Sequence, residues 1–193
     1  MNFTFAGEDY IFKTDPRLFS PNILDNGSKL LLESLIIKTS PRAIIDIGCG
    51  WGGMGIILAK IYPTAQVLLL DNDPVAFAIT KENILLNKIS NAKAFKGDIR
   101  RSIVNRTFDL AVTNPPWDKN NSVIPTLIKF AFYNLCLSGQ FYMVINQTFK
   151  AEERITKYFQ NCKVVASNPP YKILLATKNS SSWSAGAHEL AEV

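Results

Sequence analysis

Residues 42–52 read Arg-Ala-Ile-Ile-Asp-Ile-Gly-Cys-Gly-Trp-Gly, and this stretch decides the fold. Its first half, 42–47, is short and nearly continuously apolar, which is typical of a strand buried on both faces of a parallel sheet. Its second half has glycines at positions 48, 50 and 52, which allow a tight backbone turn and let a ligand approach the amides of the next helix. The stretch therefore predicts a strand, a ligand-binding turn and a helix.

Outward from this turn, predicted strands and helices alternate strictly. The helices are expected at 53–61, 74–87, 123–137 and 151–159, and the further strands at 66–70, 92–95, 108–113 and 140–145. Strands separated by helices imply right-handed crossovers. With a C-terminal antiparallel hairpin at 163–165 and 171–177, the sequence predicts an α/β fold: a doubly wound, mostly parallel seven-stranded sheet.

The N-terminal part has a different pattern. Residues 3–5 and 10–12 favour a short hairpin, and Asp25 is a plausible N-cap of a helix that Ser40-Pro41 ends. The 193 residues, 47% of them hydrophobic, suffice for one core. We therefore expect an N-terminal hairpin and leading segment at 1–24, one domain at 25–178 and a disordered tail at 179–193.

Composition narrows the class of protein. A formal charge of +5 would attract a polyanion such as RNA, although a basic enzyme without such a partner has the same charge. Three scattered cysteines and one histidine indicate neither a disulfide framework nor a metal site. No signal peptide or apolar run long enough for a membrane span is apparent, so we expect a cytoplasmic protein with no membrane contact.

Polar residues follow the next two predicted strands. Asp71 ends the strand at 66–70, and Asp98 follows the strand at 92–95. In a doubly wound sheet these positions converge where ligands bind, and a carboxylate there can accept hydrogen bonds from ribose hydroxyls or an adenine amine. Asp73 before Pro74 is better explained as an N-cap, and Asp98 could equally be a turn residue.

After the strand at 108–113 come Asn114, Pro115, Pro116 and Trp117. A rigid turn with a side-chain amide, exposed carbonyls and a large ring is suited to gripping a planar amine. The amide oxygen of Asn114 and the backbone carbonyl of Pro115 would accept its N–H groups, while Trp117 stacks on a base. The alternative is that the prolines only end a strand and Trp117 fills a core gap. Together with the glycine turn, the pattern favours amine methylation, without a metal or a covalent nucleophile.

The chain resembles the class I S-adenosylmethionine-dependent methyltransferases, from Phe3 to about Lys178. The resemblance implies that the glycine turn holds the methionine part of the cofactor, that Asp71 binds the ribose, and that Asn72 and Asp98 lie at the adenine. It implies packing, and not nucleophilic chemistry, for Cys49. The implied residues that bind S-adenosylmethionine are Asp46, Gly48, Cys49, Gly50, Gly52, Asp71, Asn72, Asp98 and Asn114.

In this family, Asn-Pro-Pro-aromatic marks the branch that methylates planar nitrogen, in nucleobases or in glutamine side chains. The segments 15–20 and 24–33 further resemble the small-domain ribosomal RNA guanine-N2 methyltransferases, although Asp118 stands where members often have histidine. This resemblance implies ribosomal RNA as partner. It also implies a substrate site formed by Phe19, Ser28, Pro116 and Trp117.

Three functions stay open at this point: guanine-N2 methylation of RNA, glutamine-amide methylation of a protein, and a binding module without catalysis. A rim of basic residues favours RNA, unless they are ordinary surface charges: Arg17, Lys96, Arg100, Arg101, Arg106 and Lys119. A second copy of the motif, 168–171, is expected to be a turn that emerges at the same sheet edge. The chain is expected to be a monomer or a weak homo-oligomer.

Overall fold

A single seven-stranded sheet forms the centre of the molecule in the computed structural model, which describes residues 1–100, 107–116 and 122–180. Its strands are β3 (Ala43–Ile47), β4 (Gln66–Asp71), β5 (Ala92–Lys96), β6 (Phe108–Thr113), β7 (Leu135–Asn146), β8 (Lys163–Asn168) and β9 (Tyr171–Thr177). They lie in the order β5-β4-β3-β6-β7-β9-β8. The first five in this order are parallel, and β9 is antiparallel to both neighbours. The predicted doubly wound sheet with a C-terminal antiparallel hairpin is confirmed.

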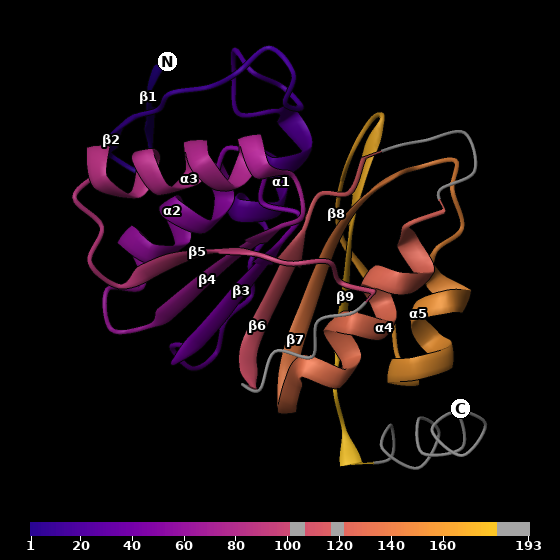
Figure 1. The fold of residues 1–193 in the computed structure, drawn as a ribbon. Coiled ribbons are helices and arrows are strands. Elements are labelled where there is room, and N and C mark those ends of the chain that lie inside the picture. Colours follow the sequence, from indigo (N-terminus) through magenta and orange to yellow (C-terminus); the bar gives the residue numbers. More distant parts are fainter. Residues whose placement is uncertain (101–106, 117–121, 181–193) are drawn as a thin grey trace.

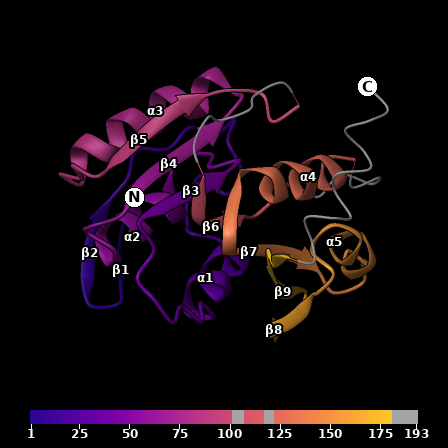
Figure 2. The ribbon, with the colours of Figure 1, turned by 90° about the horizontal axis from the view of Figure 1, so that it is seen from below.

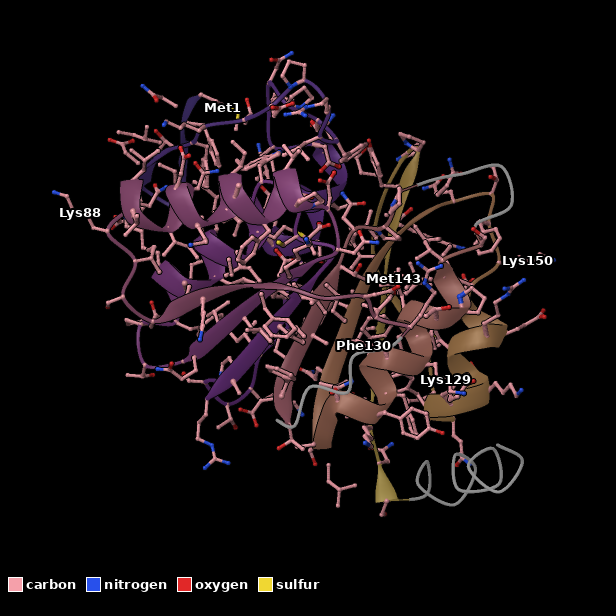
Figure 3. All side chains as sticks on the ribbon, in the orientation of Figure 1. Met1, Lys88, Lys129, Phe130, Met143 and Lys150 are labelled. Atoms are coloured by element: carbon pink, nitrogen blue, oxygen red, sulfur yellow. The ribbon has the colours of Figure 1, made fainter. Side chains whose placement is uncertain are left out.

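Helices cover both faces of the sheet (Figures 1 and 2). One face carries α1 (Asn26–Glu33), α2 (Gly53–Ile61) and α3 (Pro74–Leu86), and the other carries α4 (Ile124–Asn134) and α5 (Glu152–Phe159). Successive residues of a strand point to opposite faces, so Ile44 packs under α2 while Ile45 packs under α4. This is why the central strands β3, β4 and β6 are apolar at most positions. Figure 3 shows Met143 inside the molecule and Lys88 and Lys150 at its edge.

The predicted helix at 123–137 is three residues too long at its C-terminal end. The helix α4 ends at Asn134, and β7 begins immediately at Leu135, which pairs with Phe108. The ammonium group of Lys178 donates to the carbonyls of Phe132 and Leu135 at 2.7 Å each. A cation at the C-terminus of a helix satisfies carbonyls that have no partner within the helix. Lys178, which follows β9 and is distant from α4 in the sequence, therefore stabilises the helix end.

The first helix is also shorter than predicted, because a tertiary contact ends it. Asp25 is its N-cap as expected, but α1 stops at Glu33 rather than near Ser40. The backbone N–H of Ile36 donates to the hydroxyl of Tyr142 at 2.9 Å, which directs the chain away from the helix axis. Sequence periodicity alone does not report such a partner 106 positions away.

The N-terminal hairpin, β1 (Asn2–Phe5) and β2 (Glu8–Ile11), lies beside α2 and α3. Asn83 on α3 joins it to the glycine turn: its side-chain amide donates to the carbonyls of Lys13 at 2.9 Å and Trp51 at 2.7 Å. The ring of Phe12 meets the ring of Trp51 edge-on at 4.8 Å. The hairpin thus supports the turn that follows β3.

In the described ranges, no helix is both long and apolar enough to cross a membrane. Of the predicted tail at 179–193, residues 181–193 lie outside those ranges.

Candidate active site

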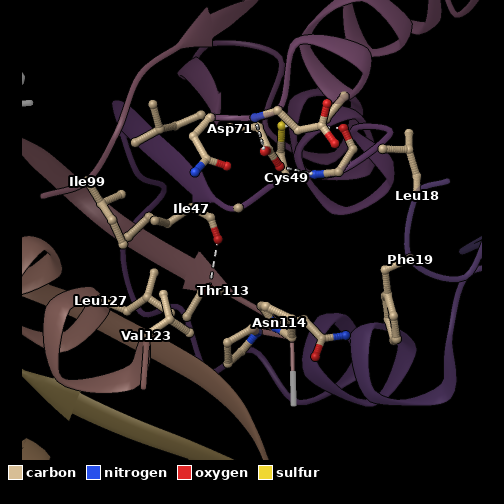
Figure 4. A pocket seen from close by; sticks show the side chains of 18 of the residues that line it. Leu18, Phe19, Ile47, Cys49, Asp71, Ile99, Thr113, Asn114, Val123 and Leu127 are labelled. Atoms are coloured by element: carbon tan, nitrogen blue, oxygen red, sulfur yellow. Dashed lines mark hydrogen bonds between the residues drawn. The ribbon is translucent and has the colours of Figure 1, made fainter. Parts of the chain in front are cut away.

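A cavity of about 640 Å³ opens at the carboxyl ends of β3, β4 and β6 (Figure 4). Its walls come from the segment before α1, from the turns that follow β3, β4, β5 and β6, and from the start of α4. The chain leaves β3 toward β4 on one side, and β6 pairs on the other side, so the strand order reverses at this point. Such reversal points are where ligands bind in open α/β sheets.

The glycine turn forms one wall of the cavity. Gly48 and Gly50 have φ values of 73° and 56°, and a Cβ atom at either position would meet no atom within 4 Å. Glycine is therefore favoured here for its backbone conformation and not for lack of space. Gly48, Cys49 and Gly50 all line the cavity. Burial raises the pKa of the Cys49 thiol well above its usual value, so the side chain packs as a neutral group.

Asp71 lies next to the glycine turn and is hydrogen-bonded to it. Its carboxylate accepts the backbone N–H of Gly50 at 2.8 Å and that of Asp73 at 3.0 Å. Burial raises the pKa of Asp71, and these N–H donors oppose the shift. A carboxylate has about four acceptor sites, so Asp71 keeps capacity for further hydrogen bonds. Asn72 and Asp73 line the same wall, and the side chain of Asp73 caps α3 as the sequence predicted.

Asp98 borders the cavity beside Ile99 and is paired with Arg100. The guanidinium of Arg100 lies 2.9 Å from the Asp98 carboxylate, and the Arg100 backbone N–H donates to it at 2.9 Å. This pair raises the pKa of Arg100. Two expectations were stated for Asp98: a turn residue and a ligand to an amine. They are compatible, because the carboxylate bonds to Arg100 within the turn and Asp98 also lines the cavity.

Asp46 lies beneath the glycine turn and Gly52 ends it, and neither residue lines the cavity. Asp46 is fully buried, and its Oδ2 accepts the backbone N–H of Gly55 at 2.8 Å. Gly52 is the N-cap of α2 with a φ of 89°. The geometry therefore places both residues where they hold the first turn of α2, and any effect they have on a ligand passes through the turn above them.

Asp46→Asn is expected to gain stability relative to the wild type as pH rises. Burial raises the pKa of Asp46 from 3.8 to about 7 in the folded protein. Between these values the unfolded chain ionises while the folded chain holds its proton, so the wild type loses up to about 4 kcal/mol of stability from pH 4 to pH 7. Asparagine keeps an oxygen for Gly55 and does not ionise. Urea unfolding at pH 5 and pH 8 measures the change, and a difference between the two proteins that stays constant with pH would contradict it.

The end of β6 is joined to the end of β3. The hydroxyl of Thr113 donates to the carbonyl of Ile47 at 2.7 Å, and Figure 4 marks this bond with a dashed line between the two labelled residues. Both residues are fully buried. This bond holds the turn that begins at Asn114 beside the glycine turn. The two motifs that the sequence places 66 positions apart therefore meet at one corner of the cavity.

The side-chain amide of Asn114 is held from α1. Its nitrogen donates to both carboxylate oxygens of Asp25, at 3.0 and 2.9 Å, and lies 2.9 Å from the hydroxyl oxygen of Ser28. The helix α1 approaches the sheet closely, since a Cβ atom on Gly27 would lie 2.7 Å from the Val144 side chain and 2.8 Å from the Tyr171 ring. Any larger residue at position 27 would push Asp25 and Ser28 away from Asn114.

The outer wall of the cavity contains residues that sequence analysis partly missed. Phe19 lies at the mouth and is 62% exposed, and Ser28, Pro115 and Pro116 also line the cavity as the resemblance implies. Arg17, a member of the predicted basic rim, lines the cavity too, whereas Asp25 and Trp51 were not predicted there as cofactor or substrate ligands. Asp25 had been predicted only as a helix cap. Apolar residues such as Met54 and Leu127 gave no signal, because cavity walls and cores have the same composition.

Several predicted residues fall outside the part of the chain that the structure describes. They are Arg101, Arg106, Trp117, Asp118 and Lys119. The second motif copy is a turn between β8 and β9, as predicted, and it lies at the carboxyl end of β7, where Tyr171 pairs with Asn146. It does not line the cavity.

Comparisons with known proteins identify the family and relatives of this chain. A family model for the methyltransferase small domain matches residues 9–175. The chain is 28% identical over 181 residues to the protein YbxB of Bacillus subtilis (strain 168), with 92% of this chain and 90% of that protein covered. It is 32% identical over 173 residues to the ribosomal RNA small subunit methyltransferase C of Sodalis glossinidius (strain morsitans), with 88% of this chain and 49% of that protein covered.

Among solved structures, the T. Thermophilus 16S rRNA N2 G1207 methyltransferase, in complex with AdoMet and guanosine, superposes with a TM-score of 0.83. The two sequences are 26% identical, and the match covers 93% of this chain and 50% of that one. The chain thus spans most of the Bacillus protein and about half the length of these two methyltransferases.

Proposed function

Because the chain belongs to the methyltransferase small domain family, we propose that it transfers the methyl group of S-adenosylmethionine to the exocyclic N2 amine of a guanine in ribosomal RNA. The observation that carries the proposal is the amide of Asn114: its nitrogen is engaged by Asp25 and Ser28, and its oxygen accepts no hydrogen bond from the described residues. An acceptor held this way beside the glycine turn is suited to an incoming N–H group.

The described residues fit S-adenosylmethionine. Open space above Gly48 and Gly50 accommodates a ligand against the backbone, and the carboxylates of Asp71 and Asp98 have the chemistry to accept from ribose hydroxyls and an adenine amine. The cavity of about 640 Å³ falls within the size range of small-molecule sites. When bound, the cofactor supplies a methyl group on a sulfonium, and its sulfur keeps the electron pair as the methyl passes to nitrogen.

The protein's own part in this reaction is positioning. We assign the side-chain oxygen of Asn114 and the carbonyl of Pro115 to the two N–H groups of the amine, which turns the nitrogen lone pair out of the base plane. Trp117 is assigned from the sequence to stacking on the base, and Phe19 and Pro116 to the walls of the base pocket. The methylated nitrogen then loses one proton to solvent. Orientation of this kind accounts for much of the acceleration in a displacement reaction.

Guanine in ribosomal RNA is the substrate that the relatives favour. The Sodalis protein is a ribosomal RNA methyltransferase, and the Thermophilus enzyme, whose name specifies N2 of a guanine, was solved with guanosine. The formal charge of +5 and the exposed Arg17 and Arg100 at the cavity suit a phosphate backbone. Both arginines are paired with carboxylates in this structure, so RNA would compete with Asp15 and Asp98 for them.

We further propose that residues 25–178 act as one catalytic domain preceded by the hairpin segment 1–24. It would work as a monomer or a weak homo-oligomer. A ribosomal RNA substrate would place the protein in the cytoplasm.

The test is transfer of a labelled methyl group from S-adenosylmethionine to four substrates. They are unmodified ribosomal RNA transcripts, small ribosomal subunits, large ribosomal subunits, and a release factor as the protein with a glutamine side chain. Nucleoside mass spectrometry should detect N2-methylguanosine in one of the RNA samples. If the label appears only in the release factor, the reaction is glutamine-amide methylation and the proposed function is wrong. Absence of S-adenosylmethionine binding in calorimetry would replace it by a non-catalytic module.

A further inference from the structure

We propose that Asp25 is a positioning residue for the reaction: its carboxylate fixes which way the amide of Asn114 faces and strengthens the amide oxygen as an acceptor. The inference rests on the function proposed above. It adds a role for a residue that lies on α1, 89 positions from the motif it serves.

The hydrogen bonds determine the orientation of the amide. The Asn114 nitrogen has two hydrogens, and three acceptor atoms surround it at 2.9–3.0 Å: both carboxylate oxygens of Asp25 and the hydroxyl of Ser28. Turning the amide by 180° would place its oxygen against the carboxylate, where two acceptors repel each other. Only one orientation therefore satisfies the amide, and it leaves the oxygen available to a substrate.

Asp25 is itself held rigidly. As the N-cap of α1 it accepts the backbone N–H groups of Gly27 at 2.9 Å and Ser28 at 3.2 Å. The positive end of the helix dipole stabilises a carboxylate at this position. The Val144 and Tyr171 side chains lie so close to Gly27 that even a Cβ atom there would clash with them, so α1 packs tightly against the sheet. The carboxylate is thus fixed relative to the sheet before any substrate arrives.

The negative charge has an electronic consequence. A hydrogen bond from an amide N–H to a carboxylate is charge-assisted, and hydrogen-bonded groups polarise one another in a partly buried site. Electron density of the Asn114 amide shifts toward its oxygen. The oxygen therefore becomes a stronger acceptor for the amine that it holds. A neutral residue at position 25 would polarise the Asn114 amide less.

An exchange of the two residues separates this role from helix capping. Asparagine caps helices about as well as aspartate. In Asn114→Asp, two carboxylates face each other and compete for a proton, so kcat is expected to fall about 100-fold or more. In the double variant Asp25→Asn with Asn114→Asp, the amide of residue 25 donates to the carboxylate of residue 114, and the charge of the pair is restored. We expect kcat at least about tenfold above that of Asn114→Asp, with unchanged cofactor affinity.

If Asp25 serves only as a cap, the double variant will be no faster than Asn114→Asp, and the proposal is overturned. Asp25→Ser provides the second comparison, because serine keeps the cap but does not reach Asn114 with a charge. This variant is expected to lower kcat about 10- to 100-fold and to leave the melting temperature nearly unchanged. A wild-type kcat in Asp25→Ser would overturn the proposal as well.

Nuclear magnetic resonance gives a readout that does not depend on turnover. The side-chain amide signal of Asn114, assigned by its loss in Asn114→Ala, should exchange with water more slowly than exposed amides in the wild type and should exchange faster in Asp25→Ser. Equal exchange rates of the Asn114 amide in both proteins would overturn the proposal that Asp25 orients this amide. If the wild type methylates no guanine but this difference is observed, the proposed function fails while the contact stands.

Discussion

Asn114→Ala is expected to lower the rate of methyl transfer by about 10²–10³-fold, the size of effect seen when one oriented hydrogen-bond partner of a reacting group is removed. The variant loses the oxygen that holds the amine, and it leaves Asp25 and Ser28 without the amide that they orient. Single-turnover transfer to RNA measures the rate. Cofactor affinity, measured by calorimetry, should stay nearly unchanged because the glycine turn and Asp71 are untouched.

The chain contains a matched control for this variant. Asn168 occupies the same position in the second Asn-Pro-Pro sequence, in a turn that does not line the cavity. Asn168→Ala should transfer methyl at the wild-type rate. Equal turnover by Asn114→Ala and Asn168→Ala would remove the catalytic assignment of Asn114.

The second large effect is expected at Asp71. Asp71→Ala should weaken S-adenosylmethionine binding by about 100-fold, since each hydrogen bond to a charged group contributes about 1.5–3 kcal/mol. The variant loses the proposed acceptor for ribose hydroxyls and also releases the backbone N–H of Gly50, which shapes the turn. Calorimetric titration with the cofactor measures the loss of affinity.

Asp73→Ser is the comparison for this experiment, because serine preserves the N-cap of α3 while the neighbouring carboxylate is removed. Its cofactor affinity should remain close to that of the wild type. If Asp71→Ala bound the cofactor as tightly as Asp73→Ser, the assignment of Asp71 to the ribose would be wrong. Melting curves of both variants show whether the fold is retained.

The mostly parallel, doubly wound sheet was predictable because the apolar runs are short, mostly separated by helices and followed by turn residues. The run before Gly48 and the run before Asn114 both became parallel strands at the centre of the sheet, β3 and β6. A buried parallel strand needs apolar side chains on both faces, so its signal in a sequence is strong.

Element ends were less predictable, because distant partners set them. The end of α4 depends on Lys178, and the end of α1 depends on Tyr142. Neither partner is near its helix in the sequence. Hydrophobic spacing continues past both ends, so periodicity predicted helices that were too long.

The candidate site was predictable where a residue type is rare at its position. The closely spaced glycines and the Asn-Pro-Pro motif stand out in a sequence. Asp25 does not, since its role as a helix N-cap already explains an aspartate at that position. Its contact with Asn114 depends on how closely α1 lies against β7 and β9, which Gly27 permits. That distance is a property of the packed sheet and leaves no local trace in the sequence.

The hydrogen bonds that build the corner around Asn114 span 66 and 89 positions of the chain. Closing such long loops costs entropy before the contacts can compensate for it, so long-range contacts of this kind slow the folding of a chain. No short fragment of this polypeptide contains both halves of the corner. During refolding, the corner can therefore be complete only once α1 has docked beside β6, β7 and β9, and recovery of catalysis is expected to follow that docking.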